Sequence, residues 1–416
     1  MFRRLIWLLA SACVAGAADV PRMLTPEDAV RLALENRAEL DAAEAMIAVE
    51  EGAALQASLR PNPTFSLQTE NWRAWGDPSL RFGRDMNIFL SASQTIETGG
   101  KRRLRTAQAE AGSEVARLEA DVFAWGVRSD VLAAYERVRA ADERVALADR
   151  VQSNHRELVR YHRLRFEEGA GAELDLVRVQ TALYQAEAAR EAASIGAEQA
   201  RFDLFRAMGL APGSEPVRLE ASEPPVEPPP TVESGIAAHP QLRLAAARVE
   251  RARRSVELSA ARAKPDVTPY FGYKRDGPFN SLIGGVSVPL TVSDRRQGER
   301  AGAAAELRRA EAEMRAAEAL VSSRVRAALS AWRSSAALVQ SVSAGATDKA
   351  EEAYRIVFAA YEENAVDLTD VLKAQEVRNE TELLVLEAGA RYRSARRDFE
   401  AALGGMADSG LMQEVR

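Results

Sequence analysis

The sequence predicts a mainly α-helical fold with a small β part, in which one structural unit occurs twice. Three observations predict it. Apolar residues recur in steps of three and four over very long stretches, which is typical of amphipathic helices. Matching motifs return about 200 residues apart, a period too long for a solenoid and therefore typical of a duplicated unit. Short segments of alternating polarity interrupt the helices at corresponding places in both units.

Composition excludes several classes of function. The 416 residues are 47% hydrophobic and 28% charged, so the chain is not a disordered one. Its net charge of −6 argues against a nucleic-acid partner, which a basic surplus would favour. One cysteine excludes a disulfide framework and a cysteine-rich zinc site. No apolar run after the leader is long enough for a transmembrane helix.

No arrangement of residues predicts catalysis or a cofactor. A nucleophile, a base and an orienting acid do not occur in a recognisable pattern, so we expect no enzyme activity. His155 and His162 lie seven residues apart, on one face of an expected helix, with Arg156 and Arg163 beside them. Two ligands are too few for a metal site, and we interpret this face as a solvated one.

Residues 1–17 have the pattern of a secretion signal. Arg3 and Arg4 precede an apolar core from Leu5 to Ala12, and small residues follow at 15–17. Two alternatives remain: a buried N-terminal helix, and a lipid attached to Cys13, since residues 10–13 loosely resemble a lipoprotein processing site. With cleavage or lipidation alike, the sequence predicts a protein that leaves the cytoplasm.

A proline-rich linker divides the rest of the chain. Seven of the 17 prolines fall between Pro212 and Pro230, so residues 211–231 are expected to be an extended linker. The predicted organisation is therefore a first repeat at 18–210, a second repeat at 232–405 and a tail at 406–416.

Matched motifs place the two repeats in register. Arg60-Pro61 corresponds to Lys264-Pro265, Lys101-Arg102 to Arg295-Arg296, and Glu168-Gly169 to Glu363-Asn364. Between the first two matches the second repeat is shorter by about ten residues. The difference falls where the loop at 71–85 in the first repeat corresponds to the loop at 275–280 in the second.

Each repeat is expected to contain one very long helix. The first runs from Lys101 to Phe166, roughly 99 Å at 1.5 Å per residue, and its counterpart from Gln297 to Tyr361 spans about 98 Å. Gly169 and Asn364 follow them, and these two residue types best tolerate the left-handed conformation that caps a helix C-terminus.

Two shorter helices accompany the long helix of the first repeat. One begins at Pro26, after the capping residue Thr25, and ends at Ser58, and the other runs from Glu173 to Met208. End to end they span about 104 Å, nearly the length of the long helix. The expected arrangement is a long helix beside two stacked antiparallel ones. A dimeric coiled coil is the alternative.

The interrupting segments predict one β-hairpin in each repeat. In the first, Phe65, Leu67 and Thr69 alternate with polar residues, and so do Met86, Ile88, Leu90 and Ala92. In the second, the same face carries Val267, Pro269, Phe271 and Tyr273, then Leu282, Gly284, Val286, Val288 and Leu290. Aromatic residues concentrate there: Phe65, Trp72, Trp75, Phe82, Phe89, Tyr270, Phe271, Tyr273 and Phe279.

Each expected strand is about 8–11 residues long, enough for a tilted strand to cross a bilayer. A sheet within lipid must close, and the smallest barrels have about eight strands. Four strands per chain therefore predict a barrel shared between copies; three chains supply twelve strands and twelve lines of helix, which favours a β-barrel continued by an α-barrel. A soluble β-layer with an aromatic core is the alternative.

The sequence resembles the TolC-like outer membrane efflux protein family. The resemblance rests on the run Ser93-Gln94-Thr95-Ile96-Glu97-Thr98-Gly99-Gly100-Lys101-Arg102, and on Val288-Pro289-Leu290 followed by Arg295-Arg296-Gln297-Gly298. The turns before Asp175 and Asp370 and the opening at 24–30 agree, so the resemblance covers nearly the whole mature chain. The Gly-Gly-Lys-Arg form is similar to the heavy-metal efflux branch.

The resemblance implies a homotrimer in the outer membrane that extends into the periplasm. It implies a passive exit duct that docks on a periplasmic adaptor protein and an inner-membrane pump of the proton-driven resistance-nodulation-division type. Alternative functions are a periplasmic adaptor and a structural coiled-coil protein. The family's adaptor-contact tips correspond to residues Gly169, Ala170, Gly171, Asn364, Ala365 and Val366.

The family's periplasmic aperture corresponds to the start of the last helix. Its acidic residue matches Asp370, and where some members carry a second acid, this chain has Lys373. That departure puts a purely acidic ring in doubt and suggests an Asp370–Lys373 pair, worth only about 0.5 kcal/mol if exposed.

Overall fold

The computed structural model describes residues 21–71, 86–211, 218–220, 236, 238–343 and 345–404. These residues form a mainly helical chain with a small antiparallel sheet, as predicted. The predicted signal peptide at 1–17, with Cys13, and the tail at 406–416 lie outside the described residues, as do most of the linker and the aromatic residues Trp72, Trp75 and Phe82.

The first repeat contains α1 (Pro26–Asn36), α2 (Ala38–Ser58), α3 (Lys101–Glu167) and α4 (Glu173–Ala207). Thr25 caps α1, because its hydroxyl accepts a bond from the Asp28 amide at 3.0 Å. The prediction of one helix from Pro26 to Ser58 was wrong, since Arg37 adopts an extended conformation between α1 and α2.

The second repeat contains α6 (Pro240–Arg262), α7 (Gln297–Ser343), α8 (Ala346–Glu362) and α9 (Leu368–Ala402). The continuous helix expected from Gln297 to Tyr361 was wrong. It is divided before α8 by Gly345, whose φ of +85° is left-handed and starts a new helix.

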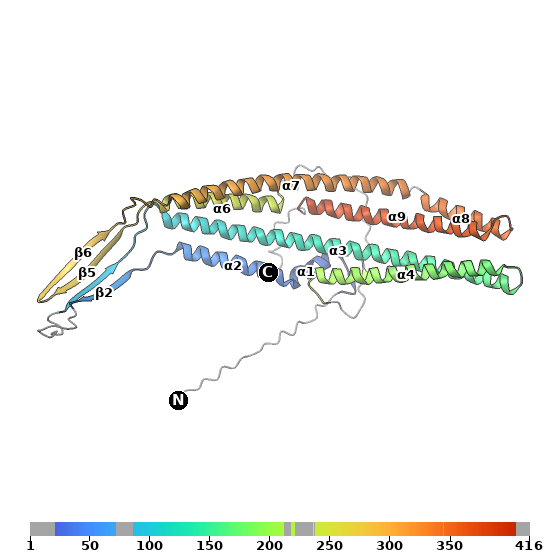
Figure 1. Cartoon of the computed structure of the whole chain (residues 1–416), viewed down its shortest axis with the longest axis horizontal. Coiled ribbons are helices and arrows are strands. Elements are labelled where there is room, and N and C mark those ends of the chain that lie inside the picture. Colours follow the sequence, from blue (N-terminus) through green and yellow to red (C-terminus); the bar gives the residue numbers. More distant parts are fainter. Residues whose placement is uncertain are drawn as a thin grey trace, which may run out of the picture.

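The helices form two antiparallel layers side by side (Figure 1). Helices α2 and α4 follow one another along α3, while α6 and α9 follow one another along α7 and α8. This confirms the predicted stacking of two shorter helices along the long helix of the first repeat, and the second repeat has the same arrangement along α7 and α8. The four-stranded sheet lies at one end of the molecule and the turns α3–α4 and α8–α9 at the other. None of the helices in the described ranges has an apolar stretch sufficient to cross a membrane.

Four strands form one antiparallel sheet in the order β2 (Thr64–Glu70), β3 (Asn87–Ser93), β5 (Thr268–Asp276) and β6 (Phe279–Ser287). The central pair, β3 and β5, joins the hairpins of the two repeats. The last strand was expected to reach Leu290, but it ends at Ser287.

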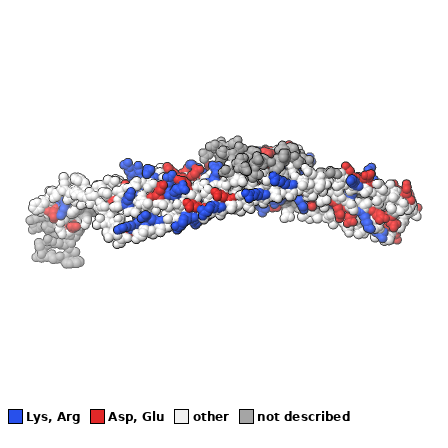
Figure 2. All heavy atoms as spheres, turned by 90° about the horizontal axis from the view of Figure 1, so that it is seen from above, with Lys and Arg blue, Asp and Glu red and all other residues white. Residues whose placement is uncertain are grey.

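The register places the predicted apolar faces of all four strands on one side of the sheet. One row across it is Phe65, Ala92, Phe271 and Gly284, and the next is Leu67, Leu90, Tyr273 and Leu282. This side is open to the surroundings, with Phe65 71% and Leu282 73% exposed. The sheet end of the molecule shows few charges, which gather instead over the helices (Figure 2).

A short second sheet, absent from the sequence prediction, fixes the start of the first repeat. Strand β1 (Met23–Leu24) pairs in parallel with β4 (Arg218–Leu219), which follows α4. The buried Tyr135 of α3 donates a 2.9 Å bond to the carbonyl of Leu24. Burial raises the pKa of Tyr135 to about 12, so the phenol stays protonated and remains a donor.

Candidate functional site

The turns α3–α4 and α8–α9 have the same backbone geometry. Gly169 and Asn364 are left-handed, with φ of +72° and +61°. The next residue in each turn, Ala170 or Ala365, donates a 2.8 Å bond to the carbonyl five residues before it. These bonds satisfy the last carbonyls of the helix. The prediction of equivalent caps at Gly169 and Asn364 is therefore confirmed.

One apolar cluster holds both turns. Its buried members come from α3, α4, α8 and α9: Leu158, Val159, Val179, Tyr361, Leu368 and Val371. Val366 packs against it, whereas Ala170 and Ala365 are exposed. Gly171 lies against α3, because a Cβ there would come within 3.1 Å of the Phe166 amide nitrogen. The turns are thus rigidly supported and present their tips outward.

The contact turns, residues 167–175 and 362–370, are strongly acidic. Neither contains a Lys or Arg, and each carries four carboxylates: Glu167, Glu168, Glu173 and Asp175 in one, Glu362, Glu363, Asp367 and Asp370 in the other. All of these except the half-buried Asp175 are exposed. This end of the molecule therefore presents a negative surface to any partner.

Asp370 and Lys373 lie on the first turns of α9, and both are exposed. Among the described residues no ion pair joins them, so the suggested pair does not form within one chain. The matching pair in the first repeat is Asp175 and Arg178, separated by 4.0 Å. Arg178 also donates a 3.4 Å bond to Thr369 and so links the starts of α4 and α9.

Behind these residues lies a buried polar layer that sequence reasoning missed. Gln375 is 1% exposed, and neither of its amide atoms has a hydrogen-bond partner. Arg378, one turn further, reaches Glu351 at 3.2 Å and lies 4.4 Å from the Tyr354 ring. Because the Gln375 amide has no partner, the hydrogen-bonding groups buried between α3, α8 and α9 are only partly satisfied.

The interpretation of His155 and His162 as a solvated face was wrong. His162 is 2% exposed and packs against the rings of Tyr161 and Tyr361, while His155 is half-buried. Burial lowers the pKa of both, and the charge of Arg378 lowers that of His155 further. No group of three His, Cys, Asp or Glu residues in the described part of the chain is arranged to hold a metal ion.

The glycine-rich motif lies where the sheet meets the helices. Lys101 is 7% exposed and donates bonds to the carbonyl of Lys264 at 2.5 Å and to Asp266 at 2.7 Å. Asp266 also accepts from the Thr98 amide at 2.9 Å. Although burial opposes ionisation, these hydrogen bonds lower the pKa of Asp266, so it stays charged.

Two left-handed glycines shape this junction. Gly99 and Gly100 have φ of +67° and +71°, and a Cβ on Gly99 would come within 2.7 Å of the Lys264 side chain. Arg105 ties the same place to the end of α2, since it pairs with Glu97 and donates to the carbonyl of Ala57 at 2.9 Å. The motif therefore joins the two repeats where the sheet meets the helices.

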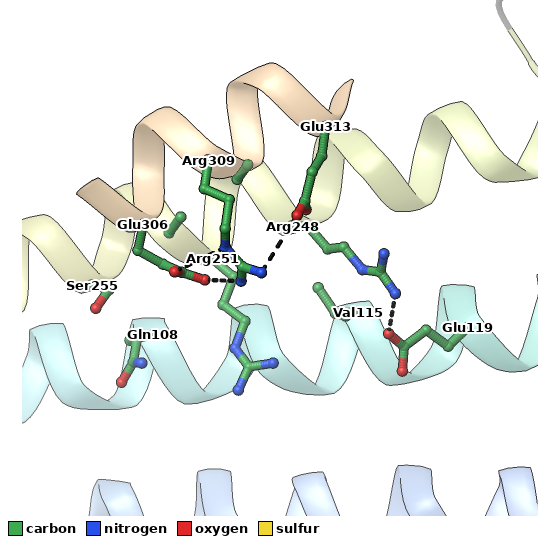
Figure 3. A pocket seen from close by; sticks show the side chains of 11 residues that line it. Gln108, Val115, Glu119, Arg248, Arg251, Ser255, Glu306, Arg309 and Glu313 are labelled. Carbon is green, nitrogen blue, oxygen red and sulfur yellow. Dashed lines mark hydrogen bonds and ion pairs between the residues drawn. The ribbon is translucent and has the colours of Figure 1, made fainter. Parts of the chain in front are cut away.

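A groove of about 380 Å³ lies between α3, α6 and α7 (Figure 3). Arg248 pairs with Glu119 at 2.7 Å. Arg309 pairs with Glu306 and, at 3.4 Å, with Glu313. The hydrogen bond from Arg309 lowers the pKa of Glu306. These opposite charges largely compensate one another.

The chain matches a protein family over both repeats. The family described as Outer membrane efflux protein covers residues 29–210 and 232–405. Among curated proteins, the cobalt-zinc-cadmium resistance protein CzcC of Cupriavidus metallidurans is 28% identical over 396 residues, 89% of this chain and 88% of that one.

Solved structures share the fold. The channel protein CusC superposes with a TM-score of 0.78 at 14% identity, covering 91% of this chain and 92% of that one. The outer membrane protein VceC of Vibrio cholerae gives 0.74 at 18% identity, covering 91% and 96%. These likenesses agree with the predicted fold, and the family match decides against the adaptor and the structural coiled coil. The chain belongs to the outer membrane efflux protein family: it is a channel of the outer membrane that extends into the periplasm, and not an enzyme.

Proposed function

We propose that three copies of the chain form one conduit, a 12-stranded β-barrel in the outer membrane continued by an α-barrel in the periplasm. The observation that carries this is the sheet. Its strands β2 and β6 have no neighbour on their outer edges among the described strands, and one face is apolar and exposed. Unpaired edges cannot be satisfied in lipid, and four strands are too few to close.

The contact turns are proposed to meet a periplasmic adaptor protein through Gly169, Ala170, Gly171, Asn364, Ala365 and Val366. Their rigid caps and common apolar cluster support this role. The surrounding carboxylates favour a partner whose docking surface is basic or rich in hydrogen-bond donors.

The periplasmic aperture is proposed to lie at Asp370 and Lys373. Both side chains are exposed near the turns, at the end of the molecule far from the sheet. Because Lys373 makes no pair with Asp370 within the chain, we expect it to face a neighbouring copy. The conduit is passive, and transport energy would come from an inner-membrane pump of the resistance-nodulation-division type.

Heavy-metal cations are the proposed cargo. The support is the similarity to CzcC, whose name describes resistance to cobalt, zinc and cadmium.

Export is proposed to use residues 1–17 as the signal, with removal of Cys13 or its lipidation. The repeats are proposed to occupy 18–210 and 232–405, with linker 211–231 and tail 406–416.

The test is the assembly of the full chain. Expressed with its leader and extracted from outer membranes in detergent, it should have the mass of a trimer by light scattering and form conducting pores in planar bilayers. A monomer that remains soluble without detergent would contradict the proposal. Co-purification with an adaptor, against a variant carrying Ala170→Arg and Ala365→Arg, tests the turns.

A further inference from the structure

The hairpins show that the two repeats match residue by residue. Thr64 pairs with Ser93 in the first hairpin, and Thr268 pairs with Ser287 in the second. Thr268 lies as far after Pro265 as Thr64 lies after Pro61. Likewise, Ser287 precedes Arg295 by the same interval by which Ser93 precedes Lys101. The repeat correspondence found in the sequence is therefore built into the register of the sheet.

The chain already contains one joint between repeats. Ser93 of β3 pairs with Tyr270 of β5. The pairing continues beyond the strands, because Ile96 and Val267 exchange two backbone bonds of 2.8 and 3.2 Å. It ends at Lys101 and its bond to Asp266.

The corresponding second joint has no partner in a single chain. By the repeat correspondence, the outer edge of β6 matches the edge of β3 that pairs with β5, and the outer edge of β2 matches the edge of β5 that pairs with β3. Both outer edges lie unpaired, at opposite sides of the described sheet. Beyond β6 the segment 288–296 is irregular, with Leu290 84% exposed, whereas its counterpart after β3 is bonded to the second repeat.

We infer that an adjacent copy completes this joint in the register that the first joint sets. This inference rests on the proposed trimer and specifies its contact. Ser287 pairs with Ser66 of the adjacent copy, antiparallel, so that Val286 lies opposite Leu67 and Gly285 opposite Gln68 of that copy.

The alternation of apolar and polar side chains supports this register. In the existing joint Gly272 lies opposite Ser91, and a Cβ on Gly272 would come within 2.2 Å of a neighbouring carbonyl oxygen. At the matching position of the new joint the glycine is on the other strand, where Gly285 meets Gln68 and is covered by the Tyr270 ring of its own chain. A slip by one residue would turn the apolar face of β2 away from that of β6.

The polar anchor of the new joint differs from the old one. Arg295 replaces Lys101, and Asn62 of the adjacent copy replaces Asp266. The inferred contact is a hydrogen bond to a neutral amide rather than an ion pair. An amide leaves no uncompensated carboxylate on a chain that awaits its neighbours, which suits a joint formed only on assembly.

A disulfide tests the register. Ile96 and Val267 form a hydrogen-bonded pair. Because hydrogen-bonded and non-hydrogen-bonded pairs alternate along antiparallel strands, Ser93–Tyr270 is a non-hydrogen-bonded pair. The matching pair Ser287–Ser66 should be one as well. Such pairs have Cα atoms about 4.5 Å apart, within disulfide reach. The double variant Ser66→Cys with Ser287→Cys should lose its monomer band and give covalent trimers on non-reducing gels after boiling.

The matched control is Ser66→Cys with Ser281→Cys. Ser281 lies on the same face of β6 but roughly 20 Å further along the strand, beyond disulfide reach. It should remain at the background level of the single-cysteine variants, which also report any contribution of Cys13.

The outcomes separate the register from the trimer. Cross-linking of the 66–287 pair alone supports the inference. A trimer by light scattering in which that pair stays unlinked, or in which Ser287→Cys links better to Thr64→Cys or Gln68→Cys, overturns the register and leaves the trimer standing. An unmodified chain that forms no trimer overturns the proposed function, and the inference with it.

Discussion

The long helical segment differs between the two repeats. Helix α3 runs unbroken through 67 residues, whereas its counterpart is divided into α7 and α8. The second repeat has one residue more between Arg295 and Glu363 than the first has between Lys101 and Glu168. One extra residue would rotate the following helix by about 100°. The left-handed Gly345 interrupts the helix before that rotation reaches the contact turn.

The connections from strand to long helix also differ between the repeats. The joint at Lys101 is packed inside the chain, whereas the one at Arg295 is exposed. In the proposed trimer each repeat contributes one free edge to the contact between copies, the first repeat through β2 and the second through β6. This difference teaches that equivalent segments of the two repeats are packed to different degrees within one chain.

Breaking the free edge should have the largest effect. Val286 lies opposite Pro269 of β5, and the carbonyl of Pro269 points away from β6, because it accepts a bond from the Gln94 amide. Val286 and Pro269 are therefore a non-hydrogen-bonded pair, and the Val286 amide points toward the free edge. Val286→Pro should therefore spare the hairpin and abolish the trimer, because the ring blocks the neighbouring strand. Trimer yield by light scattering is the measurement.

Val286→Ala is its control and should assemble normally, since it keeps the amide. Circular dichroism of both variants checks that the helices persist. A normal trimer yield from Val286→Pro would contradict the barrel.

The two joints should respond unequally to the loss of their cation. Lys101→Met leaves the Lys264 carbonyl without its donor and Asp266 with only the Thr98 amide, and it should lower the free energy of unfolding by about 2–3 kcal/mol. Arg295 is exposed in one chain, and its inferred contact in the trimer is a hydrogen bond to a neutral amide, so Arg295→Met should cost less, about 1 kcal/mol. Denaturant unfolding in detergent measures both, and equal losses would contradict the asymmetry.

The aperture is expected to respond mainly to the second repeat. Asp370→Ala removes an exposed carboxylate at the proposed entrance and should raise single-channel conductance by roughly one and a half to twofold. Asp175→Ala is the matched variant in the first repeat, where the acid lies beside Arg178. Unchanged conductance for Asp370→Ala in planar bilayers would remove this residue from the aperture.

Replacing the glycine that divides α7 from α8 should cost about 1 kcal/mol. A side chain at Gly345 meets no neighbour within 4 Å, so the cost comes only from its left-handed backbone. Gly302→Ala is the control, because it lies within α7 in open space and should stabilise the protein by up to about 1 kcal/mol. Thermal unfolding compares them, and a stabilising Gly345→Ala would contradict the proposed role.

The smallest effect should be the pH dependence that the buried His162 adds to the stability of the first repeat. Burial lowers the pKa of His162 from 6.5, with Asp175 raising it and Arg165 lowering it. Below that pH the unfolded chain binds a proton that the folded chain resists, so stability falls as the pH drops through 6.5. The matching residue in α8 is Val357.

His162→Val should reduce this loss, by less than about 1 kcal/mol. Unfolding at pH 7.5 and at 5.5 measures it. An identical pH dependence in the variant would assign the effect to other groups, of which His155 is the first to test.

Local chemistry made most elements of the fold predictable. The apolar spacing of α3, the caps at Gly169 and Asn364 and the alternation in the strands all act within a few residues, so they can be read along the chain. The same holds for the match between the repeats. The buried His162 was missed because a lone histidine carries no signal of which neighbour will cover it.

Long-range packing decided the rest. The pairing of β3 with β5, the parallel contact of β1 with β4 and the partly satisfied layer around Gln375 join segments from distant parts of the chain. Periodicity reports which side of a segment is apolar, but not which surface will meet it. The amino-acid order thus specified helices, caps and sheet faces, while their partners emerged only when both repeats packed against each other.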